Sequence, residues 1–533
     1  MNQERVDGRL RFVRSLHLTS CQMGAEEVLR CLDETPIAIV IGSSTAGTLN
    51  TQITALTALN LLGRLFRHLF ICVPPNAIVD ERLPFVQGQL DRALLQFATR
   101  VSPEIIAEPV VKPPAGAVEL HISDDCPAAN KRHIYCTGAG WLARVGRRAV
   151  YLSSAEAARG NPIGPLIAAA LGVAEVFKLV FGDVLQGVVP IEDISFSALT
   201  YQAQGKLIGP DLGRVTLPPT LLVGAGSIGS SFLWGLAHLQ NTQGTLTIVD
   251  HDKLEIHNPD RAPLVLDDAA ELGLEKSQWA RDTVQPWLPG LKITPYTGTI
   301  RQYIDSLPQD YTLPLAISAV DSIESRRDIQ DALPARILNA STGPTKIEIT
   351  RHAHFGKDAC LYCLYLPEIL DRPPIRLAME RTGFGQKDVA ELMLPNNPRR
   401  LTAGNIRGIE QRNNLAPGTL NEFTGRSLQD LLAQELWYSQ APIPLETGHA
   451  LVTTAFVSAL AGFLLLAETL KEANPAFAPY RLNGIYEQEL LSMPNEFLYP
   501  GQRDKTGYCL CWDKQTRQRL YSQKYVQIDG VVS

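Results

Sequence analysis

The chain has 533 residues, of which 45% are hydrophobic and 20% are charged, a composition typical of globular proteins. A single hydrophobic core stops growing at about 250 to 300 residues, so a chain of this length is expected to divide into two or three domains. Its 49 Lys and Arg and 55 Asp and Glu leave a formal net charge of −6, which excludes a basic field for nucleic acid or an anionic membrane. Small-molecule or protein partners are therefore expected.

The N-terminal segment, residues 1–9, is polar and has no apolar stretch of the kind that a secretory signal needs. Nine cysteines, an odd number, argue against a disulfide framework, so a cytoplasmic protein is expected. One apolar segment, Ala450 to Leu470, has about the length of a membrane span. It contains Ser458 and Glu468, which favours a buried interface helix, and no membrane partner is expected.

The first predicted strand, Ile37 to Ile41, continues into a glycine turn from Gly42 to Gly47 and then into an apolar helix. This order is typical of a nucleotide-binding Rossmann-like unit. The next strand, His68 to Val73, is followed by two prolines rather than by an acidic residue, so a ligand for a ribose is missing. We interpret the first half as a nucleotide-binding fold that has lost its nucleotide.

A second strand and glycine turn, Leu221 to Gly229, contain the pattern Gly-x-Gly-x-x-Gly at Gly224, Gly226 and Gly229. Glycines at this spacing permit a tight turn, a close approach of the backbone to phosphate, and a helix whose N-terminus faces the anion. The following strand ends at Asp250, where a carboxylate can accept hydrogen bonds from a ribose. These residues predict a nucleotide site, for which an NAD dehydrogenase is the default interpretation.

Polar residues beyond Asp250 indicate a triphosphate instead. Asp252, Asn258, Arg261 and Asp321 follow predicted strands, and Lys276 begins a predicted helix. Residues at strand ends of a doubly wound sheet gather at its carboxyl edge, beside the glycine turn. Two cations and a carboxylate able to bind a metal would surround a triphosphate there. Attack by a carboxylate on the α-phosphate of ATP brings like charges together, and Arg, Lys and Mg²⁺ neutralise them. Hydride transfer needs none of these groups.

Four cysteines form two closely spaced pairs, Cys360 with Cys363 and Cys509 with Cys511. Together they could form a tetrahedral site for structural Zn²⁺, because Cys-x-x-Cys is a good zinc chelate. The second pair has the spacing Cys-x-Cys, and the alternative is a set of buried apolar cysteines.

The order of these motifs resembles the E1-like ThiF/MoeB/HesA superfamily, whose members adenylate the C-terminal glycine of ubiquitin-like proteins. The resemblance covers about Leu221 to Cys363, and more loosely the two late cysteines. It implies a zinc site at the cysteines and a nucleotide site in which each residue has a role. Asp250 would hold the ribose, Asn258, Arg261 and Lys276 the phosphates, and Asp321, followed by Arg326, the Mg²⁺.

Family members work as dimers or pseudo-dimers, in which an arginine from the opposite half reaches the ATP. The segment Arg11-Phe-Val-Arg14-Ser-Leu is similar to the family's arginine-rich N-terminal motif, with Ser15 where the family usually has Gln. The resemblance therefore implies Arg14 as this arginine, and a surface residue is the alternative. A pseudo-dimeric monomer and a homodimer both stay open.

The chain is most similar to the single-chain E1 proteins of bacterial ubiquitin-like conjugation operons, the Bil type of antiphage defence. That resemblance implies an α/β fold of two Rossmann-like adenylation halves packed as a pseudo-dimer. Residues 1–205 would form the inactive half, residues 206–365 and 446–533 the active half, and residues 366–445 a helical insertion. The late helices of both halves end in Ala-Glu-x-x-Lys, at Lys178 and Lys471, as expected for a duplication.

The expected activity is ATP- and Mg²⁺-dependent adenylation of a ubiquitin-like protein that ends in glycine, with transfer to an E2-like partner. A thioester needs a nucleophilic cysteine, and the usual region for it, here Leu364 to Tyr508, contains none. Either the reaction stops at the adenylate, or another cysteine serves, or the nucleophile has been replaced. The alternatives are a sulfur-carrier adenylyltransferase of ThiF or MoeB type, a non-catalytic nucleotide-binding scaffold, and an NAD oxidoreductase.

Overall fold

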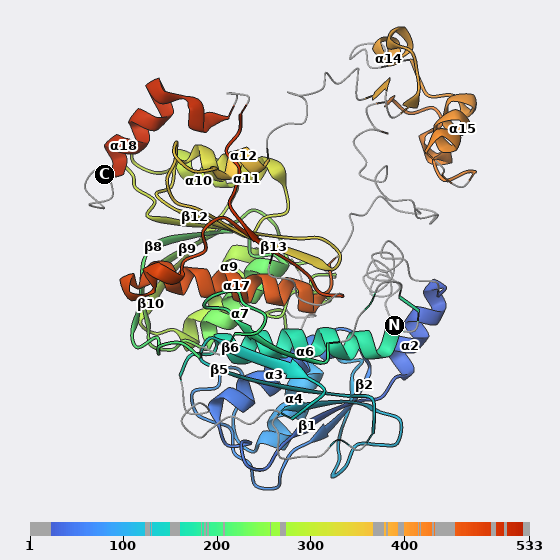
Figure 1. The fold of residues 1–533 in the computed structure, drawn as a ribbon, viewed down its shortest axis with the longest axis vertical. Helices are drawn as coiled ribbons and strands as arrows, with labels where there is room; N and C mark the ends of the chain where they lie inside the picture. Colours follow the sequence, from blue (N-terminus) through green and yellow to red (C-terminus); the bar gives the residue numbers. More distant parts are fainter. Residues whose placement is uncertain are drawn as a thin grey trace.

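The structure is a computed structural model of the chain, built around two sheets with helices between and around them (Figure 1). Besides a few single positions, it describes residues 23–122, 130–149, 160–182, 191–205, 208–255, 257–266, 273–365, 382–392, 399–413, 417–428, 453–491, 497–505 and 509–525. Every structural statement below refers to these residues.

The first sheet has seven described strands in the order β3-β2-β1-β4-β5-β6-β7. Strands β3 to β5 of this order run parallel, and β6 and β7 are antiparallel. The strands are β1 (Ile37–Ile41), β2 (His68–Cys72), β3 (Ile106–Pro109), β4 (Val118–Ile122), β5 (His133–Ala139), β6 (Leu142–Gly146) and β7 (Asp193–Ser197). The two strands predicted before and after the first glycine turn are confirmed as β1 and β2.

The second sheet has eight described strands in the order β10-β9-β8-β11-β12-β13-β14-β15. Strands β10 to β12 of this order run parallel, and the last three are antiparallel. The strands are β8 (Val215–Val223), β9 (Thr242–Asp250), β10 (Leu291–Thr297), β11 (Leu315–Ser318), β12 (Ile337–Thr342), β13 (Lys346–His352), β14 (Ile485–Glu489) and β15 (Phe497–Tyr499).

Both sheets therefore follow one plan. Five parallel strands have the third-second-first-fourth-fifth order of a doubly wound fold, and antiparallel strands extend the same edge. In each sheet the first strand leads into a glycine turn and a helix, α3 (Leu49–Gly63) after β1 and α7 (Ser227–Ala237) after β8. The predicted fold of two Rossmann-like halves is confirmed.

The remaining helices connect the strands or cover the sheets. They are α2 (Ala25–Glu34), α4 (Leu90–Val101), α6 (Ile163–Phe181), α9 (Lys276–Val284), α10 (Ile300–Asp305), α11 (Ile323–Asp331), α12 (Leu361–Leu364), α14 (Gln386–Leu392), α15 (Ala403–Arg412), α17 (Ala455–Ala473) and α18 (Arg519–Tyr525). Short 3₁₀ segments occur at Gln285–Trp287, Asn421–Phe423, Pro475–Tyr480 and Leu510–Trp512, and a short π-helical segment occurs at Lys514–Gln518.

Four helices, α3, α6, α7 and α17, lie between the two sheets and form the seam of the halves (Figure 1). Their sequences are apolar on nearly all sides, as expected for helices without a solvent-facing surface, and every residue of α3 is buried. Helix α17 is buried from Ala455 to Glu472, so the predicted interface helix is confirmed. One continuous hydrophobic core contains residues of both halves.

Helix α6 is the one described helix that is long and apolar enough to cross a membrane. Of its most apolar window, 89% is buried inside the protein, against β5, α3 and α17. It is therefore a buried helix of the core between the two halves.

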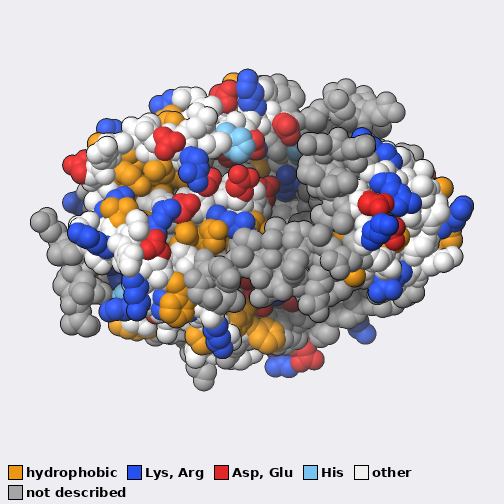
Figure 2. Space-filling model, turned by 90° about the horizontal axis from the view of Figure 1, so that it is seen from above, with side chains coloured by type: hydrophobic (Ala, Val, Ile, Leu, Met, Phe, Trp, Pro, Cys, Tyr) orange, Lys and Arg blue, Asp and Glu red, His pale blue; other side chains and the backbone are white. Residues whose placement is uncertain are grey.

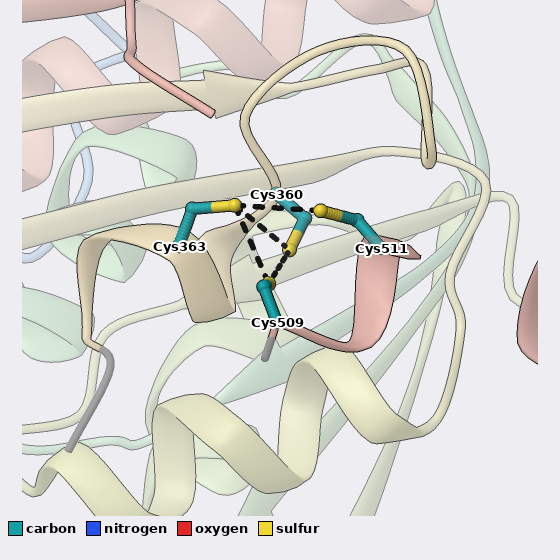
Figure 3. Close-up of side chains that lie close together, drawn as sticks. All are labelled: Cys360, Cys363, Cys509 and Cys511. Atoms are coloured by element: carbon teal, nitrogen blue, oxygen red, sulfur yellow. Dashed lines mark hydrogen bonds between the residues drawn. The ribbon is translucent and has the colours of Figure 1, made fainter. Parts of the chain in front are cut away.

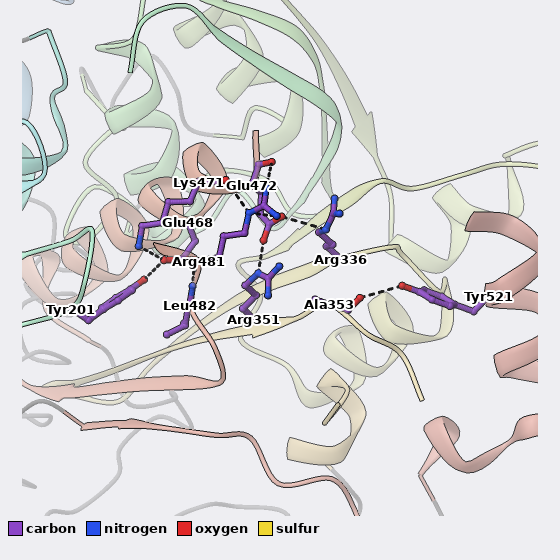
Figure 4. Close-up of polar contacts among 10 residues, drawn as sticks. All are labelled: Tyr201, Arg336, Arg351, Ala353, Glu468, Lys471, Glu472, Arg481, Leu482 and Tyr521. Carbon is purple, nitrogen blue, oxygen red and sulfur yellow. Dashed lines mark hydrogen bonds and ion pairs between the residues drawn. The ribbon is translucent and has the colours of Figure 1, made fainter. Parts of the chain in front are cut away.

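The repeated Ala-Glu-x-x-Lys sequence forms the same buried arrangement twice. In α6, Glu175 binds Lys178 at 2.6 Å and accepts a hydrogen bond from the Ile191 amide at 2.9 Å. In α17, Glu468 binds Lys471 at 2.6 Å and accepts from the Leu482 amide at 2.9 Å. Each pair joins the late helix to the segment that leads into the next antiparallel strand. Figure 4 shows the second pair beside Glu472, which binds Arg336, Arg351 and Arg481.

The segment between α12 and α17 contains α14 and α15 and has a hydrophobic core of its own. That core includes Val389, Ile406, Ile409 and Phe423. Of the predicted helical insertion at residues 366–445, the structure describes α14, α15 and the short helical segment Asn421–Phe423, and much of the rest lies outside the described residues. On the face seen in Figure 2, basic and acidic side chains of the described residues are intermixed.

Candidate functional site

The glycine turn after β8 needs glycine at two of its three positions for steric reasons. Gly224 has φ +95°, and a Cβ there would lie 2.6 Å from the carbonyl oxygen of Ala319. A Cβ on Gly229 would lie 2.0 Å from the carbonyl oxygen of Gly224. Gly226 is the N-cap of α7, and a Cβ there would meet nothing within 4 Å. The turn is therefore tight on the protein side and open at the helix N-terminus, where an anion would bind.

Asp250, the last residue of β9, fixes the shape of this turn. Its carboxylate accepts a hydrogen bond from the Ala225 amide at 2.6 Å and another from the Asp252 amide at 2.8 Å. The side chain is buried, and burial raises its pKa, while the two amide hydrogen bonds and the charge of Lys276 oppose this shift. Asp250 thus connects the ends of β8 and β9 at the carboxyl edge of the sheet.

Asp252 and Lys276 form an ion pair at the same edge, with 2.8 Å between Nζ and Oδ2. Lys276 is the first residue of α9, and its amide donates to the carbonyl of Asp252 at 2.9 Å. Partial burial alone would raise the pKa of Asp252, but the hydrogen bond and charge of Lys276 lower it overall. The Lys276 side chain is only 11% exposed, and its ammonium group is paired with a half-exposed carboxylate.

Asn258 and Arg261 lie on the loop that follows β9. Asn258 is buried; its Oδ1 accepts from the Glu255 amide at 2.9 Å, and its carbonyl accepts from the Arg261 and Ala262 amides. These bonds close the loop on itself. Arg261 is half-buried on the turn that they form.

Asp321 follows β11, which lies beside β8 in the sheet. The Ala319 amide donates to the Val223 carbonyl at 2.9 Å, so the end of β11 borders the glycine turn directly. Arg326 is buried and donates to the carbonyls of Val320, at 2.5 Å, and of Asp321, at 3.1 Å. The Asp321 side chain itself is exposed. The structure thus brings the predicted strand ends to one edge.

A second possible metal-binding group at this edge consists of Asp250, His251 and Asp252, whose ligand atoms lie within 4.8 Å of one another. Lys276 already neutralises Asp252, and Asp250 already accepts two amide hydrogen bonds. Asp321 is an exposed carboxylate beside the turn for which no ion pair is described.

The first half contributes a contact that sequence reasoning missed. Arg64, at the end of α3, donates to the carbonyls of Pro259, Pro263 at 3.1 Å and Val265 at 2.9 Å. Asn60 donates to the Pro263 carbonyl at 2.9 Å and accepts from Nε of Arg64 at 2.8 Å. Both side chains are buried. Nothing in the helix sequence distinguishes this arginine from one on a surface; only the packing of the halves does. Arg14, the predicted arginine of the opposite half, lies outside the described residues.

The turn after β1 differs from the one after β8. Three residues separate β8 from α7, whereas seven, Gly42 to Thr48, separate β1 from α3. The buried Gln52 donates to the carbonyls of Ala46 at 2.9 Å and Ile78 at 2.8 Å, and accepts from the Asp80 amide at 2.7 Å. The Gln52 side chain therefore joins this turn to the segment that follows β2.

The four predicted zinc ligands meet in space, although Cys509 and Cys511 lie almost 150 residues beyond the first pair (Figure 3). Their Sγ atoms lie within 4.8 Å of one another, and the measured separations are between 3.3 and 3.7 Å. Four sulfurs around one Zn²⁺, each at about 2.3 Å, would lie about 3.8 Å apart in a tetrahedron. The set is therefore close to the size of a zinc site.

Two of the other described cysteines, Cys72 and Cys136, are poor candidates for a nucleophile. Cys72 and Cys136 are buried, and burial raises the pKa of the Cys136 thiol well above its usual range. Cys31 is half-buried on α2. Cys21 and Cys126 lie outside the described residues.

Comparison with known proteins agrees with this division into halves. Residues 36–188 match the BilD N-terminal domain, and residues 214–484, slightly more than half of the chain, match the ThiF family. The chain is 28% identical over 508 residues to an uncharacterized protein, y4jF, of Sinorhizobium fredii (strain NBRC 101917 / NGR234). The alignment covers 93% of this chain and 92% of that protein. The ThiF match contains both the glycine turn and the polar strand ends. The chain belongs to the ThiF family and is an E1-like protein of the Bil-type operon kind.

Proposed function

We propose that the second half adenylates the C-terminal glycine of a ubiquitin-like protein with ATP and Mg²⁺. The observation that carries this proposal is the convergence of the glycine turn, Asp250, Lys276 and Asp321 at the carboxyl ends of β8, β9 and β11. This edge, at the point where the strand order reverses, is where doubly wound sheets bind nucleotides. Membership of the ThiF family implies the use of ATP and Mg²⁺.

In the proposed reaction, a carboxylate oxygen of the partner's last glycine attacks the α-phosphorus of ATP. A new C–O–P bond forms, the bond from the α-phosphorus to the oxygen that bridges the α- and β-phosphates breaks, and pyrophosphate leaves. Both reactants are anions, so the site must neutralise charge and position the groups. The α7 N-terminus with Gly226, Lys276 and Arg261 would supply this neutralisation, and Asn258 would hold the loop that presents Arg261.

Asp250 would receive the ribose. Each of its oxygens accepts one amide hydrogen bond and keeps a second lone pair, so a ribose hydroxyl can still donate to it. Asp252 would act indirectly: it would position the Lys276 ammonium, with which it forms an ion pair.

Asp321 would hold Mg²⁺, since it offers an exposed hard oxygen ligand beside the glycine turn. The bound ion would neutralise phosphate charge. The four cysteines would hold a structural Zn²⁺, because their separations fit a tetrahedral thiolate site and they join α12 to the C-terminal segment. Residues 206–365 and 446–533 would form this active half.

Residues 1–205 would form a half without nucleotide. The longer turn after β1 and the Gln52 bridge support this proposal, because they replace the short turn and the acidic strand end of the active half. Arg14 would reach the ATP from this half.

Residues 366–445 would form the insertion that meets an E2-like partner in antiphage conjugation in the cytoplasm. The separate core of α14 and α15 supports an independent binding module. Because Leu364 to Tyr508 contains no cysteine, transfer would proceed either from the adenylate or through a cysteine elsewhere in the chain.

The test is Mg²⁺-dependent exchange of pyrophosphate into ATP in the presence of a ubiquitin-like protein that ends in glycine. Asp321→Ala should abolish exchange, with a loss of roughly 100-fold or more, as for other single electrostatic contributions in active sites. Asp310→Ala, which removes an exposed loop carboxylate, is the matched control. Absence of exchange with every such partner encoded in the neighbouring genes would overturn the proposal. Exchange with a sulfur carrier alone would favour the adenylyltransferase of sulfur transfer.

A further inference from the structure

We propose that Arg64 of the first half is a positioning residue for the ATP site of the second half. This inference rests on the proposed function. It gives the half that has lost its nucleotide a direct task in the chemistry, separate from the task proposed for Arg14.

The contacts of Arg64 converge on one short loop. Its guanidinium donates to the carbonyls of Pro259, Pro263 and Val265, and its Nε donates to Asn60, which itself donates to Pro263. Three backbone acceptors within seven residues are thus held by one planar side chain. The sequence separation between Arg64 and these acceptors is at least 195 residues, so the contacts exist only when the halves pack.

The loop in question carries the residues proposed to bind phosphate. Pro259 lies between Asn258 and Arg261, and Pro263 and Val265 follow directly. Two of the three acceptors are carbonyls of prolines, which have no amide hydrogen of their own to donate. Arg64 adds three hydrogen bonds from the other half to those that the loop forms within the second half.

Only a group with several donors in one plane, such as a guanidinium, can make the contacts of Arg64 with Asn60 and three carbonyls. A lysine ammonium is a point charge with three donors and cannot reproduce the planar arrangement that serves Asn60 and three carbonyls. Arg64→Lys keeps the charge and most of the volume but loses this geometry. A displacement of catalytic groups by about 1 Å can cost about 100-fold in rate, so loosening the loop should be visible in catalysis.

The experiment compares Arg64→Lys and Arg64→Ala with wild type in pyrophosphate exchange and in ATP binding by isothermal titration calorimetry. The expected result is a KM for ATP raised about ten-fold or more in Arg64→Lys, and faster hydrogen exchange of residues 258–265. Guanidinium ion in solution should restore part of the activity of Arg64→Ala, and ammonium ion should not.

Tyr201→Phe is the matched control. It removes another buried hydrogen bond between the halves, from the Tyr201 hydroxyl to Glu468 at 2.8 Å, without touching the loop. It should lower thermal stability and leave the KM for ATP unchanged. If Arg64→Lys keeps the wild-type KM while wild-type exchange is robust, the inference is wrong and the proposed function stands. If the wild type itself binds no ATP, it is the proposed function that fails.

Discussion

At the scale of single residues, Asp250 shows how a binding side chain also builds its own site. A carboxylate has no donor, and both oxygens of Asp250 accept backbone amides from the two strand ends that they connect. The residue is therefore needed for the turn even before a nucleotide is present. The sequence predicts a ribose ligand at this position, but it gives no sign of the bonds to Ala225 and Asp252, since these depend on the side-chain conformation.

We predict that Asp250→Asn damages the site although the side chain keeps its shape. The amide nitrogen of Asn would face a backbone amide donor at either Ala225 or Asp252, which leaves two donors opposed. Leaving one buried donor unsatisfied costs about 1 to 3 kcal/mol of unfolding free energy. Urea denaturation should show this loss, and calorimetry should show weaker ATP binding. Asp310→Asn should change neither quantity, and an unaltered Asp250→Asn would contradict the role of these bonds.

At the scale of elements, the packing of α17 on α7 depends on a glycine where the two helices cross. A Cβ on Gly462 of α17 would lie 2.5 Å from the Cβ of Ser231 and 2.7 Å from backbone atoms of Ile228 and Phe232 in α7. Backbone cannot yield as a flexible side chain does. The helix that carries the glycine turn at its N-terminus is thus held in place by close backbone contact with α17.

Gly462→Ala should therefore destabilise the protein, by about 1 to 3 kcal/mol, as overpacked cores do. Because α7 must shift, ATP binding should weaken as well. Gly343→Ala is the control, since its Cβ would find ordinary contact at 3.8 Å, and its melting temperature should match that of the wild type. Equal melting temperatures for the two variants would refute the close crossing.

A further prediction at this scale concerns the four cysteines. The late pair connects α12 to α18, whose Tyr525 binds the Leu333 carbonyl at 2.8 Å and the Leu313 amide at 3.2 Å. Mass spectrometry of the metal content should find about one Zn²⁺ per chain, and Cys360→Ser should lose it. The variant and the chelated wild type should melt at lower temperatures, with faster proteolysis of the C-terminal segment. A metal-free wild type of unchanged stability would rule the site out.

At the scale of the whole molecule, the sequence predicts the fold far better than it predicts the site. Hydrophobic periodicity and glycine turns identify β1, β8, α3 and α7, because these signals are local. The strand-end residues follow from the rule that parallel strands share a carboxyl edge. The contact of Arg64 with the distant loop depends on how two halves pack, and no local pattern encodes it.

The packing of the halves also predicts a response to acid. His238 lies in the seam beside Phe85 and Trp234, and burial lowers its pKa to about 4 from an ordinary 6.5. The unfolded chain binds a proton there that the folded chain excludes. Stability from this group is therefore complete above pH 6.5 and is lost as the pH falls toward 4, by at most about 3 kcal/mol.

Urea denaturation at several pH values checks this prediction. His238→Gln should reduce the fall in unfolding free energy between pH 6.5 and 4, whereas the exposed His354→Gln should leave it unchanged. A slope that is identical in all three proteins would show that His238 does not titrate as its burial requires.

The buried glutamate–lysine pair occurs once in each half, so the two halves of the chain can be compared with each other. Both halves keep the pair and its bond to the next segment, at Ile191 and at Leu482. The second strand of each glycine-turn unit differs, by contrast: β9 ends at the acidic Asp250, whereas β2 ends at Cys72. If the halves descend from one ancestral gene, features present twice report selection for folding, and features present once report selection for chemistry. By that criterion a buried ion pair, which elsewhere would suggest an active site, belongs here to the architecture alone.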